Sequence, residues 1–345
     1  MEKALRVVYA RAVSKDPFDM LSAEQRENVR SALVATFGSD SVGAVTPVAG
    51  GITTASTFRL EARGRAYLLR VEGEPSPLRN PHQYISMRIA TEAGIAPAIH
   101  HIDEAARIVV IDFVEQKPLN TYPGGPRALA QALGELFSRV QAAPLFPYYV
   151  NYADIVARLF AHVRRTGLFA AGVLDTHVER LELIREAYNA GSTRLVSSHN
   201  DPTPGNILFD GERLWLIDWE SACRNDPLVD AAIVLDHFAR SEELEGVLLK
   251  SWFGRVPDEG LRARLAPIRA LTRLYYAGVM LSASAAASWV TDDTDLSAPT
   301  PQQFRLAIDE GRLKRGAAET QHVLGKMFLA SFFSGVAPPQ FAHTA

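Results

Sequence analysis

A segment near the middle of the chain, residues 197–220, constrains the fold most strongly, and its sequence is SSHNDPTPGNILFDGERLWLIDWE. Two short apolar runs, residues 207–209 and 214–217, flank Asp210 and Gly211, a dipeptide that typically forms a hairpin turn. Short strands on either side of such a turn pair with each other in an antiparallel manner. The sequence therefore predicts a small β-hairpin, preceded by a loop rich in proline and glycine.

Polar side chains gather at the open end of this hairpin. In a hairpin with a short loop, Asn206 lies opposite Trp215 or Ile217, which puts Asn206 and Asp218 side by side. Asp201 precedes Asn206 on the adjoining loop. Carboxylate and amide oxygens suit Mg²⁺, which keeps several waters and binds through one or two carboxylates together with substrate phosphates. The two carboxylates and the amide oxygen at this end of the hairpin therefore form a set of ligands that suits Mg²⁺.

The order of these residues is that of phosphoryl-transfer sites. Kinases use an aspartate, an asparagine five residues later and a metal-binding aspartate after a hairpin. Asp201, Asn206 and Asp218 follow that order. One such Asp–Asn spacing is common by chance, but the set that begins with His199 and includes the hairpin is far more specific.

Composition limits the other classes of function. The chain has 345 residues, enough for about two domains. Its net charge of −3 argues against a nucleic-acid binder, and 47% hydrophobic residues are ordinary for a globular protein. The single cysteine, Cys223, rules out an intrachain disulfide and a cysteine-based zinc site, and fits a reducing cytoplasm.

Neither a secretory signal nor a membrane span is expected. Charges occur throughout the first residues, so no apolar signal core is present. Residues 274–291 carry no charge, but they fall short of the about 20 apolar residues that a span needs, and they include serines and many alanines. We expect a buried helix there and a cytoplasmic location.

Signals for helix and strand alternate in the N-terminal part. Residues 22–37 predict a helix that begins with a capping box of Ser22 and Gln25. Alternating residues with glycine turns predict antiparallel strands, and a second helix follows them. A small sheet with one packed helix is expected from residues 45–74, 81–93 and 108–114.

From about residue 120 the pattern is mainly helical. Residues 126–142 and 174–188 keep a helical period. Thr300, Pro301 and Gln303 combine a cap, a proline at the first helical position and a capping box.

These motifs resemble the aminoglycoside phosphotransferase and choline kinase superfamily of small-molecule kinases. The resemblance covers about residues 45–240. It rests on residues 199–201 with 204–208, on the Ile-Asp-Trp-Glu run that ends at Glu220, and on Asn225-Asp226-Pro227 and residues 230–232. Arg70 and Asn200 resemble the choline and ethanolamine kinase-like branch more than the aminoglycoside branch.

The resemblance implies an α+β, protein-kinase-like bilobal fold. A small N-terminal lobe with an antiparallel sheet and one packed helix would span residues 1–114, with a helical extension at 1–40 and the nucleotide-binding sheet at 45–114. A large, mainly helical lobe would span residues 115–345 and carry the catalytic loop and metal hairpin at 197–220.

The resemblance also implies roles for the central residues. Asp201 would accept the proton of the substrate hydroxyl or orient that hydroxyl, while Asn206 and Asp218 would hold Mg²⁺ against the phosphates. His199 belongs to the catalytic motif, where its ring would brace the loop. Asp230 would cap loop amides.

ATP is the cofactor that the resemblance implies, and the N-terminal lobe would bind it. Arg70 stands where kinases have the strand lysine, and a guanidinium can hold phosphate oxygens through two hydrogen bonds. The remaining nucleotide-binding residues would be the glycine turn and the hinge, namely Gly50, Gly51, Thr53, Thr54, Asp112, Phe113 and Val114.

One feature departs from the family pattern. Kinases pair the strand lysine with a glutamate on the next helix, but Gln83 stands in the corresponding helix here. Either Arg70 serves phosphate directly or its partner lies elsewhere.

The acceptor is expected to be a small hydroxylated amine such as choline or ethanolamine. A quaternary ammonium group favours aromatic surroundings, and the candidates include Tyr275, Tyr276 and Trp289. Glu220 could contact the metal or a cationic substrate, or it could form a surface salt bridge. An aminoglycoside or another small alcohol stays open as acceptor, with Asp292, Asp293 and Asp295 as a candidate acidic cleft.

Two further alternatives stay open. A nucleotide-binding pseudokinase or scaffold would explain Gln83. Residues 1–40 could brace the small lobe or serve as the arm of a homodimer.

Overall fold

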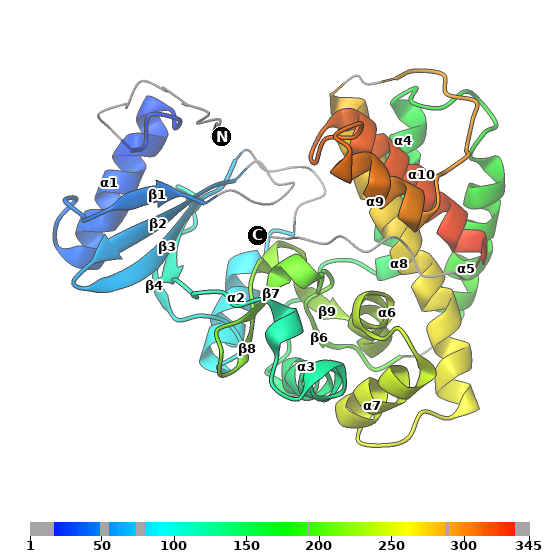
Figure 1. Ribbon diagram of the computed structural model, residues 1–345, viewed down its shortest axis with the longest axis horizontal. Coiled ribbons are helices and arrows are strands. Elements are labelled where there is room, and N and C mark those ends of the chain that lie inside the picture. Colours follow the sequence, from blue (N-terminus) through cyan, green and yellow to red (C-terminus); the bar gives the residue numbers. More distant parts are fainter. Residues whose placement is uncertain (1–16, 49–54, 74–79, 192, 288–289, 335–345) are drawn as a thin grey trace, which may run out of the picture. The chain divides into compact units, whose positions relative to one another are not determined.

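The structure is a computed structural model that describes residues 17–48, 55–73, 80–191, 193–287 and 290–334. The chain divides into two compact units, one formed by Met1–Glu74 with Ala98–Phe113 and the other by Pro75–Pro97 with Val114–Ala345 (Figure 1). Some residues expected to bind nucleotide or substrate lie outside the described residues, namely Gly50, Gly51, Thr53, Thr54 and Trp289.

A five-stranded antiparallel sheet in the order β1-β2-β3-β5-β4 forms the first unit. Side chains alternate between its faces, as β strands require. In β3, for example, Tyr67, Leu69 and Val71 are buried. The strands are β1 (Val45–Pro47), β2 (Ser56–Ala62), β3 (Arg65–Val71), β4 (Ile99–Asp103) and β5 (Ile108–Asp112).

The helix that packs on this sheet is α1 (Ala23–Phe37) (Figure 1). The predicted capping box is confirmed, since the Ser22 side chain accepts from the amide of Gln25 and the Gln25 side chain accepts from the amide of Ser22. Val29 and Leu33 are fully buried in one cluster with sheet residues such as Leu60. Residues 17–37 therefore brace the first unit.

The second helix, α2 (Gln83–Glu92), groups with the other unit. Its attachment is polar: Asn80 Nδ2 and Ser86 Oγ both donate to the carbonyl of Ala222, at 2.7 and 2.8 Å. A carbonyl oxygen has two lone pairs, so it can accept both bonds. Residues 75–97 thus group with the second unit, whereas the sequence suggested that all residues up to 114 belong to the N-terminal lobe.

Helices dominate the second unit. The long helix α8 (Glu259–Ala286) packs along α10 (Ala318–Ser334) and also against α4 (Tyr152–Arg165) and α6 (Pro227–Phe238). The other helices are α3 (Gly125–Ala142), α5 (Asp175–Ala190), α7 (Glu242–Phe253) and α9 (Pro301–Asp309), with short 3₁₀ helices η1 (Leu119–Thr121), η2 (Pro204–Asn206) and η3 (Trp219–Ser221).

The uncharged stretch that begins at Leu274 lies mostly within α8, where Leu274, Ala277 and Leu281 are fully buried. Within the described part of the chain, none of the helices combines the length and the apolar composition that a membrane crossing needs.

Two small antiparallel pairs interrupt the helices of this unit. Strand β6 (Val196–Ser198) pairs with β9 (Cys223–Asn225), and β7 (Ile207–Phe209) pairs with β8 (Leu214–Leu216). The predicted hairpin is thus confirmed, and the candidate site lies at its open end and in the loop that precedes it.

Candidate active site

The register of the β7–β8 hairpin brings the predicted metal ligands together. Ile207 pairs with Leu216, and the next bond runs from the amide of Ile217 to the carbonyl of Asn206, at 3.0 Å. Asp218 follows immediately, with a left-handed backbone at φ 65°. Aspartate tolerates this conformation better than most residues.

The turn itself is held by Asp210. Its Oδ1 accepts from the amides of Glu212 and Arg213, each at 2.8 Å, and its Oδ2 accepts from Trp215 Nε1 at 2.7 Å. Gly211 has φ 106°, which glycine adopts without strain. The turn chemistry therefore sets the register that places Asn206 beside Asp218.

Asp201 is held by two donors, one on each carboxylate oxygen. Asn206 Nδ2 donates to Oδ2 at 3.0 Å, and the Tyr276 hydroxyl donates to Oδ1 at 2.7 Å. Burial raises the pKa of Asp201 to about 8; the bond from Tyr276 opposes this rise, and the negative charges of Asp218 and Glu220 add to it. The negative charges of Asp218 and Glu220 therefore act on the Asp201 carboxyl group and favour its protonated form.

This donor set fits Mg²⁺. Asn206 Nδ2 also donates to the backbone carbonyl of Asp201 at 2.9 Å, which leaves the Oδ1 atom of Asn206 as a ligand. Within the described ranges, no group of three or more His, Cys, Asp or Glu side chains could hold a metal ion. A site with one or two carboxylates, an amide oxygen, waters and substrate phosphates is the arrangement that Mg²⁺ uses.

His199 connects the loop to the hairpin. Its ring is fully buried, lies 4.8 Å from the Trp219 ring between centroids, and places Nε2 2.9 Å from the carbonyl of Ile217. Burial lowers the pKa of His199, so the neutral ring donates from Nε2 to that carbonyl. This geometry is that of a brace between the loop and the residue before Asp218.

Asp230, in the first turn of α6, fixes the loop backbone. Its carboxylate oxygens accept from the amides of His199 and Asn200, at 2.8 and 2.7 Å. Asn200 has a left-handed backbone at φ 64°. Its side chain accepts from Asn225 Nδ2 and donates to the carbonyl of Ser221, both at 2.9 Å. Asn200 therefore ties the loop to the segment that follows Asp218.

In the first unit, Arg70 has an acidic neighbour that the sequence did not suggest. The Glu72 carboxylate lies 3.6 Å from Arg70 Nε, and both side chains are largely buried. Glu72 directly follows β3, and residues two apart in an extended segment share a face, so this neighbour could have been found from the spacing alone.

The predicted hinge makes several bonds within the first unit. The amide of Asp112 donates to the carbonyl of Ala98 at 2.9 Å, and that of Phe113 to Ala66 at 3.2 Å. The Asp112 side chain accepts from His100 Nε2 at 2.8 Å. Val114 belongs to the other unit. The role of residues 112–114 in binding adenine stays a prediction.

Tyr275 and Tyr276 differ in their surroundings. Tyr276 contacts Asp201, as described above. Tyr275 lines a pocket of about 50 Å³ together with Tyr149, Tyr152 and Asn200. Sequence reasoning missed Tyr149 and Tyr152, although the aromatic cluster at residues 146–152 is a visible signal.

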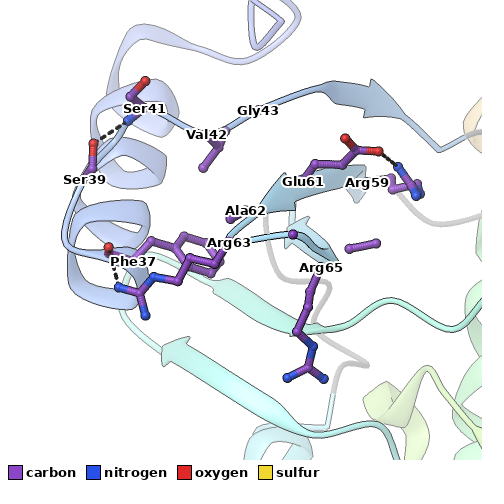
Figure 2. Close-up of a pocket in the computed structure, with 12 residues that line it drawn as sticks. Phe37, Ser39, Ser41, Val42, Gly43, Arg59, Glu61, Ala62, Arg63 and Arg65 are labelled. Carbon is purple, nitrogen blue, oxygen red and sulfur yellow. Dashed lines mark hydrogen bonds and ion pairs between the residues drawn. The ribbon is translucent and has the colours of Figure 1, made fainter.

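A larger cavity, of about 530 Å³, lies in the first unit where the β2–β3 turn approaches the end of α1 (Figure 2). Its arginines are already engaged: Arg63 donates to the carbonyl of Phe37 at 2.7 Å, Arg59 pairs with Glu61 at 2.7 Å, and Arg65 lies 3.4 Å from Asp112. This cavity lies at the opposite end of the β2–β3 hairpin from Arg70. Its lining lacks the set of carboxylate and amide groups described above for the β7–β8 hairpin.

The acidic run near residue 293 does not form an open acidic cleft in the structure. Asp293 Oδ2 lies 2.7 Å from His322 Nε2 and 3.1 Å from Lys326 Nζ. Its backbone pairs with the loop at Leu168 and Ala170. The Asp293 carboxylate is thus paired with two side chains of α10, one of which is the ammonium group of Lys326.

The sequence of this chain is similar to those of known phosphotransferases and of a curated relative. The family model described as "Phosphotransferase enzyme family" matches residues 44–268. Protein LicA of Haemophilus influenzae is 41% identical over 211 residues, which are 59% of this chain and 61% of that protein. The chain therefore spans less than two thirds of the length of this curated relative.

Two solved structures have a similar fold. A choline/ethanolamine kinase family protein from Mesorhizobium loti has a TM-score of 0.62 at 23% identity, over 88% of this chain and 99% of that one. Choline kinase LicA from Streptococcus pneumoniae has a TM-score of 0.63 at 13% identity, over 90% of this chain and all of that one.

Proposed function

The chain belongs to the phosphotransferase enzyme family, and from this premise we propose that it transfers the γ-phosphoryl group of ATP to the hydroxyl of a small amino alcohol such as choline or ethanolamine. The observation that carries the proposal is the loop in which Asn206 donates to Asp201 while the hairpin sets Asn206 beside Asp218. This order and geometry are those that phosphoryl transfer requires.

In the proposed reaction each side chain has one task. The oxygen of the acceptor hydroxyl attacks the γ-phosphorus of ATP while Asp201 accepts the hydroxyl proton, and ADP leaves. Asn206 Oδ1 and the Asp218 carboxylate would hold Mg²⁺, which supplies positive charge to the phosphate oxygens when bound. Positioning and electrostatics provide most of the rate in such transfers.

Three tyrosines support an ammonium-bearing acceptor. Tyr149, Tyr152 and Tyr275 line one pocket that also includes Asn200, the residue before Asp201. Aromatic faces attract ammonium groups, and the negative charge of Glu220 acts on both Tyr275 and Asp201. The pocket volume of about 50 Å³ is several times the ~10–15 Å³ that holds one water, which suits a small head group better than a multi-ring aminoglycoside.

The relatives favour choline within this class. The fold neighbour from Streptococcus pneumoniae is described as a choline kinase, and the Haemophilus influenzae relative carries the same protein name, LicA. The aminoglycoside alternative has less support, because Asp293 is already paired with His322 and Lys326.

The decisive experiment measures ADP release with Mg·ATP and a panel of choline, ethanolamine and several aminoglycosides. Turnover with choline or ethanolamine that Asp201→Ala abolishes supports the proposal. Turnover with an aminoglycoside alone would replace the acceptor. ATP binding without acceptor-dependent turnover would favour the pseudokinase alternative.

A second experiment tests the pocket. Tyr275→Leu removes one aromatic face, and we expect the KM for choline to rise about tenfold while the KM for ATP stays within about twofold. Tyr148→Leu, which changes an exposed tyrosine outside the pocket lining, is the matched control. Equal effects of the two changes would contradict the assignment of the pocket.

A further inference from the structure

The bond from Tyr276 to Asp201 joins residues far apart in the sequence. The Tyr276 hydroxyl donates to Asp201 Oδ1 at 2.7 Å, and Tyr276 lies beyond residue 268, where the family match ends. We propose that Tyr276 is a positioning residue, which holds the carboxylate of Asp201 in the orientation that accepts the proton of the acceptor. This inference rests on the role proposed above for Asp201.

Both donors are needed to fix the carboxylate. Asn206 holds Oδ2 and Tyr276 holds Oδ1, so the plane of the carboxyl group is set by a bond at each end. A carboxylate offers about four lone-pair positions. Lone pairs therefore remain for the acceptor proton after both bonds are made.

The phenol is held in place by its surroundings. Tyr276 is buried, and its ring lies 5.6 Å from Phe328 of α10 and 6.4 Å from His237 of α6, between centroids. The ring of Tyr275, at 5.5 Å, packs edge-on against it. A donor with this little freedom can orient the group that it binds.

Helix α8, which carries Tyr276, is itself closely packed at glycines. A Cβ atom built at Gly278 would lie 2.6 Å from Leu159 of α4, and one built at Gly325 of α10 would lie 2.6 Å from Leu281 of α8. These glycines let the three helices approach closely. The C-terminal helices thereby set the position of a group at the catalytic loop.

The experiment compares Tyr276→Phe with the wild type in steady-state ADP release. The variant keeps the ring and loses only the hydroxyl. We expect kcat with choline to fall about 10- to 100-fold, as for loss of a hydrogen bond to a charged group, while the KM for Mg·ATP stays within about twofold. Tyr122→Phe, which removes the hydroxyl of a tyrosine between η1 and α3, is the matched control.

Two further measurements separate positioning from a structural effect. Thermal unfolding reports whether the variant is folded, and a crystal structure of Tyr276→Phe should show the Asp201 carboxylate rotated away from its bond with Asn206. An unchanged kcat together with an unmoved carboxylate would overturn the proposal. A raised kcat would also overturn it, because the phenol would then compete with the acceptor.

Failure of the proposed function would look different. If the wild type releases no ADP with any amino alcohol, the acceptor is wrong. The crystal structure, together with the slow release of ADP to water that needs no acceptor, then still decides the role of Tyr276. If Asp201→Ala keeps full turnover, the role of Asp201 is wrong, and the positioning role falls with it.

Discussion

The Glu72 carboxylate lies 3.6 Å from Nε of Arg70, within the first unit and two residues further along the chain. In kinases a strand lysine is paired with a glutamate of the next helix, and the pair must be in place for activity; we propose that Arg70 takes the place of that lysine. Here Gln83 stands in helix α2, and the acidic neighbour of Arg70 is Glu72, the residue directly after β3. The absence of the helix glutamate therefore does not leave Arg70 without a carboxylate, which weakens the argument for a pseudokinase.

We predict that Glu72→Gln raises the KM for Mg·ATP about fivefold with a smaller change in kcat, because the guanidinium loses the charge that orients it. ADP release at varied ATP concentration measures the effect. Glu61→Gln is the control, since Glu61 pairs with Arg59 on the same sheet at 2.7 Å. An unchanged or lowered KM would mean that Glu72 only offsets the charge of Arg70.

Asp230→Asn should destabilise the protein by about 2–4 kcal/mol, because the buried carboxylate accepts two backbone amides and an asparagine would turn its own NH₂ group toward one of them. Urea unfolding measures the loss. Asp175→Asn, at the exposed first turn of α5, is the control and should cost less than about 1 kcal/mol. Similar losses in both variants would contradict the role of Asp230 as a cap for the loop.

Much of the local structure could be predicted from the sequence. The β7–β8 hairpin and the capping boxes at Ser22 and Thr300 are confirmed, because each is set by residues within a few positions of one another. The pairing of Arg70 with Glu72 is equally local, since a single residue separates them in the chain.

The rest depends on contacts between distant residues. Tyr276 meets Asp201 across 75 positions, and the periodicity of α8 shows only that this tyrosine is on a buried side. The grouping of α2 with the second unit depends on the carbonyl of Ala222, more than a hundred residues away. No pattern along the chain reports which carbonyl a buried Asn or Ser will reach, so these contacts required the structure.

The burial of His177 predicts how the free energy of unfolding depends on pH. Its ring is buried on α5 and lies 4.7 Å from the Phe333 ring and 6.0 Å from the Phe332 ring, between centroids. Burial lowers the pKa of His177 below its ordinary value of 6.5. The unfolded chain then binds a proton more readily than the folded one. The contribution of His177 is therefore fully present above about pH 6.5 and is lost as the pH falls below it.

Urea unfolding at pH 5, 6 and 7 should accordingly show the wild type losing up to about 1.4 kcal/mol per pH unit more than His177→Gln. The comparison isolates this residue, since all other titrating groups are shared. His162→Gln, which changes an exposed histidine of α4, is the matched control. Parallel slopes for the wild type and His177→Gln would show that His177 does not resist protonation.

Glycine-to-alanine changes provide the last prediction, because the same substitution should have opposite effects at two helical sites. At Gly278 of α8 the added Cβ would lie 2.6 Å from Leu159, whereas at Gly246 of α7 nothing lies within 4 Å of it. Gly246→Ala should stabilise the protein by about 0.5–1 kcal/mol through helix propensity, since alanine loses less backbone entropy than glycine. Gly278→Ala has the same gain in propensity, but overpacking against α4 costs about 1–3 kcal/mol, so the net effect is destabilising. Denaturant unfolding of both variants measures the two signs. If Gly278→Ala were as stable as Gly246→Ala, the close packing of α4 against α8 would not require a glycine at residue 278. The argument that this packing fixes the helix that carries Tyr276 would then fail.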